Sequence, residues 1–297
     1  MTTLLAGGTG FIGARLTEML RQQGHTVRLL SRHPKGPDQF AWDLNAGTID
    51  EKALEGVDFL INLTGAGIAD KRWTAARKKE LIESRTKSAQ VLAAAMRRSG
   101  HQPSALVSAS AIGYYGNSGE RIMQESDLPV DQGFMVECCE LWEQAADEMA
   151  QMGIRTVKLR IGIVLGKDGG ALREMIKPFL FGIGAYFGNG QAWYSWIHRE
   201  DICRMIIWAL ERNDVEGVFN AVAPHPVRNK TLVQAIAKAR KKPALIMPVP
   251  AFALKIALGE MSATILNSNR IAAEKAEQAG FTFLYPKVEQ ALNNIFT

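Results

Sequence analysis

Three glycines at intervals of three residues open the chain, and their spacing suits one kind of chemistry. In LLAGGTGFIG, Gly7, Gly10 and Gly13 lie between an apolar run and a stretch with helical periodicity. A strand, a glycine turn and a helix start together form a cradle whose backbone N–H groups bind the pyrophosphate of a dinucleotide. The residues predicted to bind it here are Gly7, Thr9, Gly10, Phe11, Ile12 and Gly13.

The end of the second apolar run indicates which dinucleotide is expected. Ser31 and Arg32 stand 18 and 19 residues beyond Gly13, where a site selective for NAD usually has an acidic residue. A carboxylate repels a ribose 2′-phosphate, whereas a guanidinium binds it bidentately. The sequence therefore favours NADP(H). The alternative is that Arg32 is a surface residue and that other residues recognise the adenine end.

The elements that must position these residues alternate along the first half of the chain. Apolar runs without polar alternation are separated by stretches of helical periodicity, such as 74–99 and 134–153. This pattern predicts an α/β fold with a doubly wound, Rossmann-like parallel sheet covered on both faces. We expect a dinucleotide-binding domain over residues 1–165, with a segment returning at about 200–223. Residues 166–199 and 224–297 are expected to form a smaller C-terminal lobe that caps the substrate.

Composition limits the other classes of function. The 297 residues are 47% hydrophobic and 22% charged, with a net charge of +5, as in an ordinary soluble protein. The basic run at 71–79 fits a solvated helix face better than a nucleic-acid site, since no binding motif accompanies it. Three cysteines predict reduced thiols, and the start of the chain lacks the pattern of a signal peptide. We expect a cytoplasmic protein without nucleic-acid or membrane partners and without a metal site; a homodimer is left open.

At the level of motifs, the chain resembles the extended branch of the short-chain dehydrogenase/reductase superfamily, and within it the epimerase-family proteins of the SDR39U1 type. The segments that carry the resemblance are GGTGFIG, SRHP, AWDL, INLTGAGIADKRW, SASAIGYYG, LRIGIVLG, GGAL, SWIHRED and LGEMSATIL. The resemblance implies a Rossmann domain that binds NADP(H), with Asp43 and Leu44 at the adenine ring. The predicted cofactor set is completed by Leu63, Thr64, Gly65, Ala66 and Arg160.

The resemblance also implies a catalytic Ser, Tyr and Lys, of which only the serine has a match, Ser110. If Glu143 matches the family's glutamate, Met135 stands in the Tyr position and Cys139 in the Lys position. A thioether holds no exchangeable proton and a neutral thiol supplies no positive field. The segment FMVECCELWEQAA contains neither Tyr nor Lys in any register.

Three residues are candidates to replace the missing acid. Tyr114 and Tyr115 lie in the loop after Ser110, and His198 lies in SWIHRED. The plainer alternatives are a Ser110 that caps a turn, a Tyr114 and a Tyr115 that pack in the interior, and a structural His198 paired with Asp201. Two functions stay open: an NADP(H)-dependent reductase or epimerase acting on a small carbonyl, alcohol or nucleotide-sugar-like substrate, and a non-catalytic NADP(H) sensor.

Overall fold

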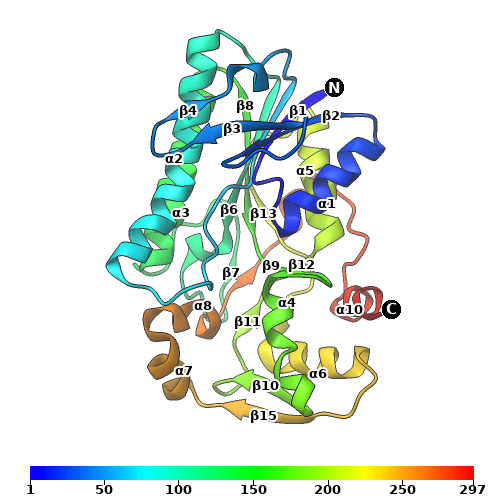
Figure 1. The fold of residues 1–297 in the computed structure, drawn as a ribbon. Coiled ribbons are helices and arrows are strands. Elements are labelled where there is room, and N and C mark those ends of the chain that lie inside the picture. The colour runs from blue at the N-terminus through cyan, green and yellow to red at the C-terminus, as the bar shows by residue number, and fades with distance from the viewer.

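The structure, a computed structural model, describes residues 1–297 and is built around one large sheet (Figure 1). Its strands are β1 (Thr2–Ala6), β2 (Thr26–Ser31), β3 (Gln39–Asp43), β4 (Thr48–Ile49), β5 (Phe59–Asn62), β6 (Ala105–Ala111), β8 (Arg155–Ile161) and β13 (Gly217–Ala221). They lie in the order β13-β8-β6-β5-β1-β2-β3-β4, and every neighbouring pair is parallel except β3 and β4. The winding reverses between β1 and β5, and a ligand crevice is expected at the carboxyl ends of strands that flank such a switch point.

Helices cover both faces of this sheet, which explains why its inner strands are apolar without alternation. The covering helices are α1 (Phe11–Gln22), α2 (Ala75–Ser99), α3 (Phe134–Gln151) and α5 (Arg199–Glu211). Leu60 and Leu106 pack with Met96 of α2 and Met149 of α3 in one core cluster. Ile61 and Val107 pack with residues of α1 and α5 in another. Successive side chains of one strand therefore point alternately to the α2–α3 face and to the α1–α5 face of the sheet. The position of a residue along its strand thus decides which helices its side chain contacts.

A smaller lobe lies below the sheet in Figure 1. Its helices are α4 (Gly170–Met175), α6 (Asn229–Ala239), α7 (Ala251–Leu258), α8 (Ala263–Leu266) and α10 (Val288–Phe296). Its strands are β9 (Ile163–Leu165), β10 (Ile183–Phe187), β11 (Trp193–Tyr194), β12 (Trp196–His198), β14 (Val227–Arg228) and β15 (Leu245–Val249). The short 3₁₀ helices of the chain are η1 (Glu51–Ala53), η2 (Ile112–Tyr115), η3 (Pro178–Phe181) and η4 (Gly259–Ser262). The lobe has its own core around the buried Trp196, Leu232 and Ile236.

One C-terminal segment departs from the expected boundary of this lobe. β16 (Arg270–Ile271) pairs with β7 (Ile122–Met123), and α9 (Glu274–Gln278) follows it. Ala276 and Phe281 then join the core cluster of the sheet domain. The ring centroids of Phe281 and Trp208 in α5 are 5.5 Å apart. Residues 270–283 therefore pack on the sheet domain, although the sequence had placed all of 224–297 in the lobe.

No helix of the structure is both long enough and apolar enough to cross a lipid bilayer.

Candidate functional site

The turn between β1 and α1 requires glycine at two positions. Gly7 has a φ of +86°, and a Cβ atom there would lie 2.8 Å from the backbone carbon of Leu63. A Cβ atom on Gly13 would overlap the carbonyl oxygen of Gly7. The turn thus brings the loop after β1 against the loop after β5, on the two sides of the switch point.

The start of α1 leaves its backbone donors free for a ligand. Gly10, at the N-cap, offers no side chain, and the first turn of the helix contains no acidic residue. The N–H groups of Phe11, Ile12 and Gly13 donate to no atom of the protein. Free N–H groups and the positive end of a helix dipole favour an anion at this position.

The loop after β5 presents a second unsatisfied group beside this turn. The N–H groups of Thr64 and Ala66 donate to side chains of the protein, at 3.1 Å and 3.0 Å. The hydroxyl oxygen of Thr64, in contrast, is buried and has no hydrogen-bond partner. Buried polar atoms without a partner are rare in native proteins, so a ligand atom at this position is a reasonable partner. The glycine cradle, the free amides and this hydroxyl group all fit a bound dinucleotide.

The predicted adenine end lies at the carboxyl ends of β2 and β3. Arg32 is exposed and forms no hydrogen bond or ion pair. The Ser31 hydroxyl accepts a hydrogen bond from the N–H of His33 at 3.2 Å. Backbone N–H groups of Ala46 and Asn45 hold the pKa of Asp43 below its ordinary value, and Leu44 is half-buried against a core cluster. The guanidinium of Arg32 is therefore available to a ligand, whereas Asp43 is engaged in its own turn.

Ser110 and Arg160 belong to a buried network instead of an open site. Glu143 of α3 accepts hydrogen bonds from Arg160 at 2.8 Å and 2.9 Å and from the Ser110 hydroxyl at 2.7 Å. Arg160 also donates to the Tyr115 hydroxyl oxygen at 3.0 Å, and that hydroxyl donates to Asn220 at 2.7 Å. Only 4% of the Arg160 side chain is exposed, so its donors are consumed inside the protein.

Strand parity explains this placement. Leu106 faces α2 and α3, and Ser110 lies an even number of residues further along β6, on the same face. Lys158 and Arg160 share that face too, since Lys158 pairs with Asp147 of α3 at 2.5 Å and Arg160 with Glu143 of the same helix. We correct two expectations on this basis. Neither Ser110 as a catalytic group nor Arg160 as a cofactor ligand has its polar atoms directed at open space.

Tyr114 and His198 are also engaged in packing. The guanidinium carbon of Arg160 lies 3.4 Å from the centre of the Tyr114 ring. His198 is buried, its ring is 4.1 Å from that of Tyr285, and its Nδ1 accepts the N–H of Glu200 as the N-cap of α5. Asp201 is not its partner, since that carboxylate accepts the N–H groups of residues 284 and 285. Both side chains therefore have structural contacts, and neither lines the cavity described below.

His198 predicts a loss of stability at acid pH. Burial lowers the pKa of His198 below its ordinary value. Below about pH 6.5 the imidazole of His198 is therefore protonated in the unfolded chain but still neutral in the folded one. The free energy of unfolding falls as the pH drops through this range. His198→Asn keeps an acceptor at the N-cap but does not titrate. In thermal melts from pH 7.5 to 5, we expect the variant to lose less stability than the parent. Parallel losses would contradict the assignment.

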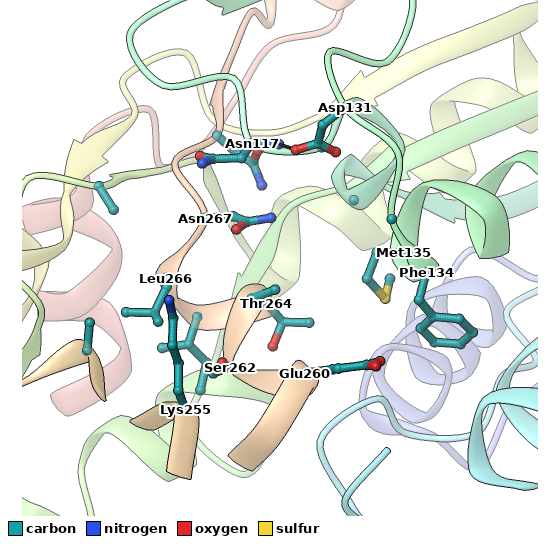
Figure 2. A pocket seen from close by; sticks show the side chains of 18 of the residues that line it. Asn117, Asp131, Phe134, Met135, Lys255, Glu260, Ser262, Thr264, Leu266 and Asn267 are labelled. Atoms are coloured by element: carbon teal, nitrogen blue, oxygen red, sulfur yellow. Dashed lines mark hydrogen bonds between the residues drawn. The ribbon is translucent and has the colours of Figure 1, made fainter. Parts of the chain in front are cut away.

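One large cavity lies between the sheet domain and the smaller lobe, and Figure 2 shows part of its lining. Its volume is about 1170 Å³. It borders the loop after β6, the start of α3, the β10–β11 connection and the segment from α7 to α8. Its polar and charged lining residues are Lys78, Asn117, Asp131, Asn189, Lys255, Glu260, Ser262, Thr264, Asn267 and Asn269. Apolar lining comes from Phe134 and Met135 at the start of α3, and from Leu266, which lies beside Lys255 on the side of the smaller lobe (Figure 2).

The chemistry available in this cavity differs from that of a Tyr–Lys site. Its lining contains no Tyr, His or Cys residue. Met135 packs on Gly113, where its methyl group would lie 3.1 Å from an added Cβ atom. Cys139 is buried, and burial raises the pKa of its thiol above the ordinary value. Met135 therefore places a thioether at the wall of the cavity, and Cys139 places a protonated thiol behind it.

The charged and amide lining residues of the smaller lobe were not predicted individually. Lys255 and Glu260 lie in the apolar stretch from 251 to 266, and the amides of Asn267 and Asn269 follow it. The signal that could have identified them is the presence of two charged residues, Lys255 and Glu260, in this mostly apolar stretch. Glu260 forms an ion pair with Lys78 of α2, a contact between two segments that no local pattern connects.

Together, the doubly wound sheet, the glycine turn at its switch point and the cavity under a second lobe define a dinucleotide-binding protein of the Rossmann type with a capping lobe. The comparison with known families is specific. Residues 3–221 match the NAD dependent epimerase/dehydratase family, and residues 249–295 match a domain of unknown function, DUF1731. The chain belongs to the NAD dependent epimerase/dehydratase family, and it is an epimerase-family member of the extended short-chain dehydrogenases/reductases.

Its relatives include bacterial and mammalian proteins. The chain is 38% identical to epimerase family protein YfhF of Bacillus subtilis, over 99% of this chain and 98% of the relative. It is 34% identical to mouse epimerase family protein SDR39U1, over 99% of both chains. The crystal structure of human SDR39U1 with NADPH superposes with a TM-score of 0.90 at 32% identity, covering 100% of this chain and 99% of the human one.

Proposed function

We propose that this chain binds NADP(H) across the carboxyl ends of β1, β2 and β5. The observation that carries the proposal is the start of α1, where three backbone N–H groups beside the glycine turn have no partner in the protein. The unpaired Arg32 at the end of β2 supports NADP(H) over NAD(H), because its guanidinium suits a 2′-phosphate. The relative crystallised with NADPH, at 32% identity, adds support.

We infer further that the chain is a reductase or epimerase of a small carbonyl or alcohol compound. The bound nicotinamide would exchange a hydride with the substrate. The substrate would occupy the 1170 Å³ cavity, oriented by the amides and by Lys255. The accompanying proton would pass through Asp131, a lysine of the lining or water, because no tyrosine is present there.

A second candidate function is a non-catalytic sensor of NADP(H). One observation favours it, namely Met135 and a buried Cys139 where the family's acid and its activating cation would stand. A dinucleotide that bridges the sheet domain and the lobe would then act through the shape of the protein instead of through turnover.

A substrate panel separates the two functions. Purified protein is titrated with NADPH, and the fluorescence of the nicotinamide is followed. Binding is expected under both functions. The protein is then incubated with NADPH and a panel of sugars, quinones and aldehydes while absorbance is recorded. Oxidation of NADPH by any member supports the enzyme, whereas tight binding with no turnover across the panel supports the sensor.

Arg32→Ala tests the choice of dinucleotide. We expect the variant to lose about tenfold in affinity for NADPH and almost nothing for NADH, because only NADPH carries the 2′-phosphate. Both dissociation constants are measured by nicotinamide fluorescence. Arg98→Ala, an exposed arginine at the end of α2, is the matched control. Equal losses for the two dinucleotides would remove Arg32 from the 2′-phosphate site.

A further inference from the structure

The helices α1 and α5 begin side by side on the same face of the sheet. The Sγ atom of Cys203, in the second turn of α5, lies 3.7 Å from the carbonyl oxygen of Ile12. Arg15 of α1 forms a bidentate ion pair with Glu200 of α5, at 2.7 Å and 2.9 Å. The first residue of α5, Arg199, therefore stands next to the start of α1, where the free N–H groups lie.

The side chain of Arg199 lies against the aromatic ring of Phe11. Its guanidinium carbon is 5.1 Å from the ring centre, within the range of a cation–π contact. The side chain of Arg199 forms no hydrogen bond and no ion pair with any residue of the protein. The carboxylate next to it in sequence, Glu200, is already bound by Arg15. Arg199 is thus a half-buried cation that is positioned by packing and has all its donors free.

Three glycines fix the position of this arginine by enclosing Phe11. A Cβ atom on Gly166, Gly169 or Gly170 would lie 2.7 Å, 2.6 Å or 2.8 Å from the Phe11 ring. The Cβ and Cδ atoms of Arg199 would lie 3.2 Å and 3.4 Å from the one on Gly166. The ring and the arginine stem therefore fit closely against the three glycines of this loop, and the guanidinium is held beside the first residue of α1.

We propose that Arg199 binds the pyrophosphate of the dinucleotide, opposite the free N–H groups of α1. This inference rests on the proposed binding of NADP(H). A pyrophosphate carries two negative charges, and the N–H groups supply only partial positive charge. A fixed guanidinium adds a full charge and two parallel donors for phosphate oxygens. Arg32 and Arg199 would then recognise the two anionic parts of the same ligand separately.

Three ligands distinguish these two arginines. NADPH carries both anionic parts, NADH carries only the pyrophosphate, and adenosine 2′-monophosphate carries only the 2′-phosphate. Arg199→Gln is expected to weaken NADPH and NADH by about tenfold each and to leave adenosine 2′-monophosphate unchanged. Arg32→Ala is expected to weaken NADPH and adenosine 2′-monophosphate and to spare NADH. The dinucleotides are titrated by fluorescence, and the monophosphate by displacement of NADPH.

The controls address folding and nonspecific charge. Gln at position 199 keeps most of the stem that packs on Phe11, and melting temperatures without ligand show whether the fold is retained. Arg173→Ala removes an exposed arginine of α4 and should change none of the affinities. If the parent binds NADPH and Arg199→Gln binds it equally well, the inference is overturned while NADP(H) binding stands. An equal loss for adenosine 2′-monophosphate would also overturn it, because that ligand has no pyrophosphate. If the parent binds no dinucleotide, the proposed function itself fails.

Discussion

Glu143→Leu is expected to lower the free energy of unfolding by about 3–5 kcal/mol, the typical cost of removing one partner of a buried ion pair. The side chains of Arg160 and Glu143 are only 4% and 8% exposed, so water cannot replace the lost carboxylate. The change also leaves the Ser110 hydroxyl without its acceptor. Urea denaturation followed by circular dichroism measures the loss.

A double variant separates the ion pair from simple packing. Arg160→Met combined with Glu143→Leu removes both charges, and we expect it to recover a large part of the stability lost by Glu143→Leu alone. If the stability that the double variant loses relative to the parent equals the sum of the losses of the two single variants, the two side chains act independently. A loss below about 1 kcal/mol in Glu143→Leu would show that the network is not tightly coupled.

Gly13→Ala is expected to weaken NADPH binding by at least about tenfold and to lower stability by about 1–3 kcal/mol, as overpacking does. The new Cβ atom would overlap the carbonyl oxygen of Gly7 and lie 2.7 Å from the Cα atom of Gly8. Because these are backbone atoms, α1 must move away from β1, and its N–H groups move with it. Fluorescence titration and thermal melts record the two effects.

Gly133→Ala is the matched control for this change. Gly133 has an extended backbone with a φ of −164°, and no atom lies within 4 Å of an added Cβ atom. We expect NADPH binding and stability close to those of the parent. If Gly13→Ala behaves like this control, the close packing of α1 on β1 does not determine the dinucleotide site.

Much of the fold follows from local patterns in the sequence. The apolar run, glycine turn and helix from residue 2 to residue 22 form β1 and α1 as expected. The long helix predicted at 74–99 is found as α2. Its ends are set by Thr74, whose side chain accepts the N–H of Arg77 as the N-cap, and by Gly100, which adopts the left-handed conformation after the last turn. These elements are decided by short-range periodicity and capping, which a single sequence contains. The alternation of strands and helices then predicts the parallel sheet.

The chemistry of the interior was harder to predict, because both faces of the sheet are buried. β6 is apolar or small throughout, so its sequence does not reveal which face Ser110 occupies. Only the partner, Glu143 of α3, identifies that face. The cavity was missed for a related reason. Its lining comes from segments as distant as Trp73 and Asn269, whose proximity depends on the whole topology.

The path of the chain after residue 269 limits how the two lobes of this protein can be exchanged with those of relatives. A chimaera that imports residues 224–297 as one block would also replace Ala276 and Phe281, which fill the sheet domain under Trp208. The imported segment would then have to match a foreign surface. A graft that keeps residues 270–283 from the host, and takes only the flanking stretches from the donor, leaves that surface intact. We therefore expect a chimaera with three junctions, after residues 223, 269 and 283, to fold where a chimaera with the single junction after residue 223 does not.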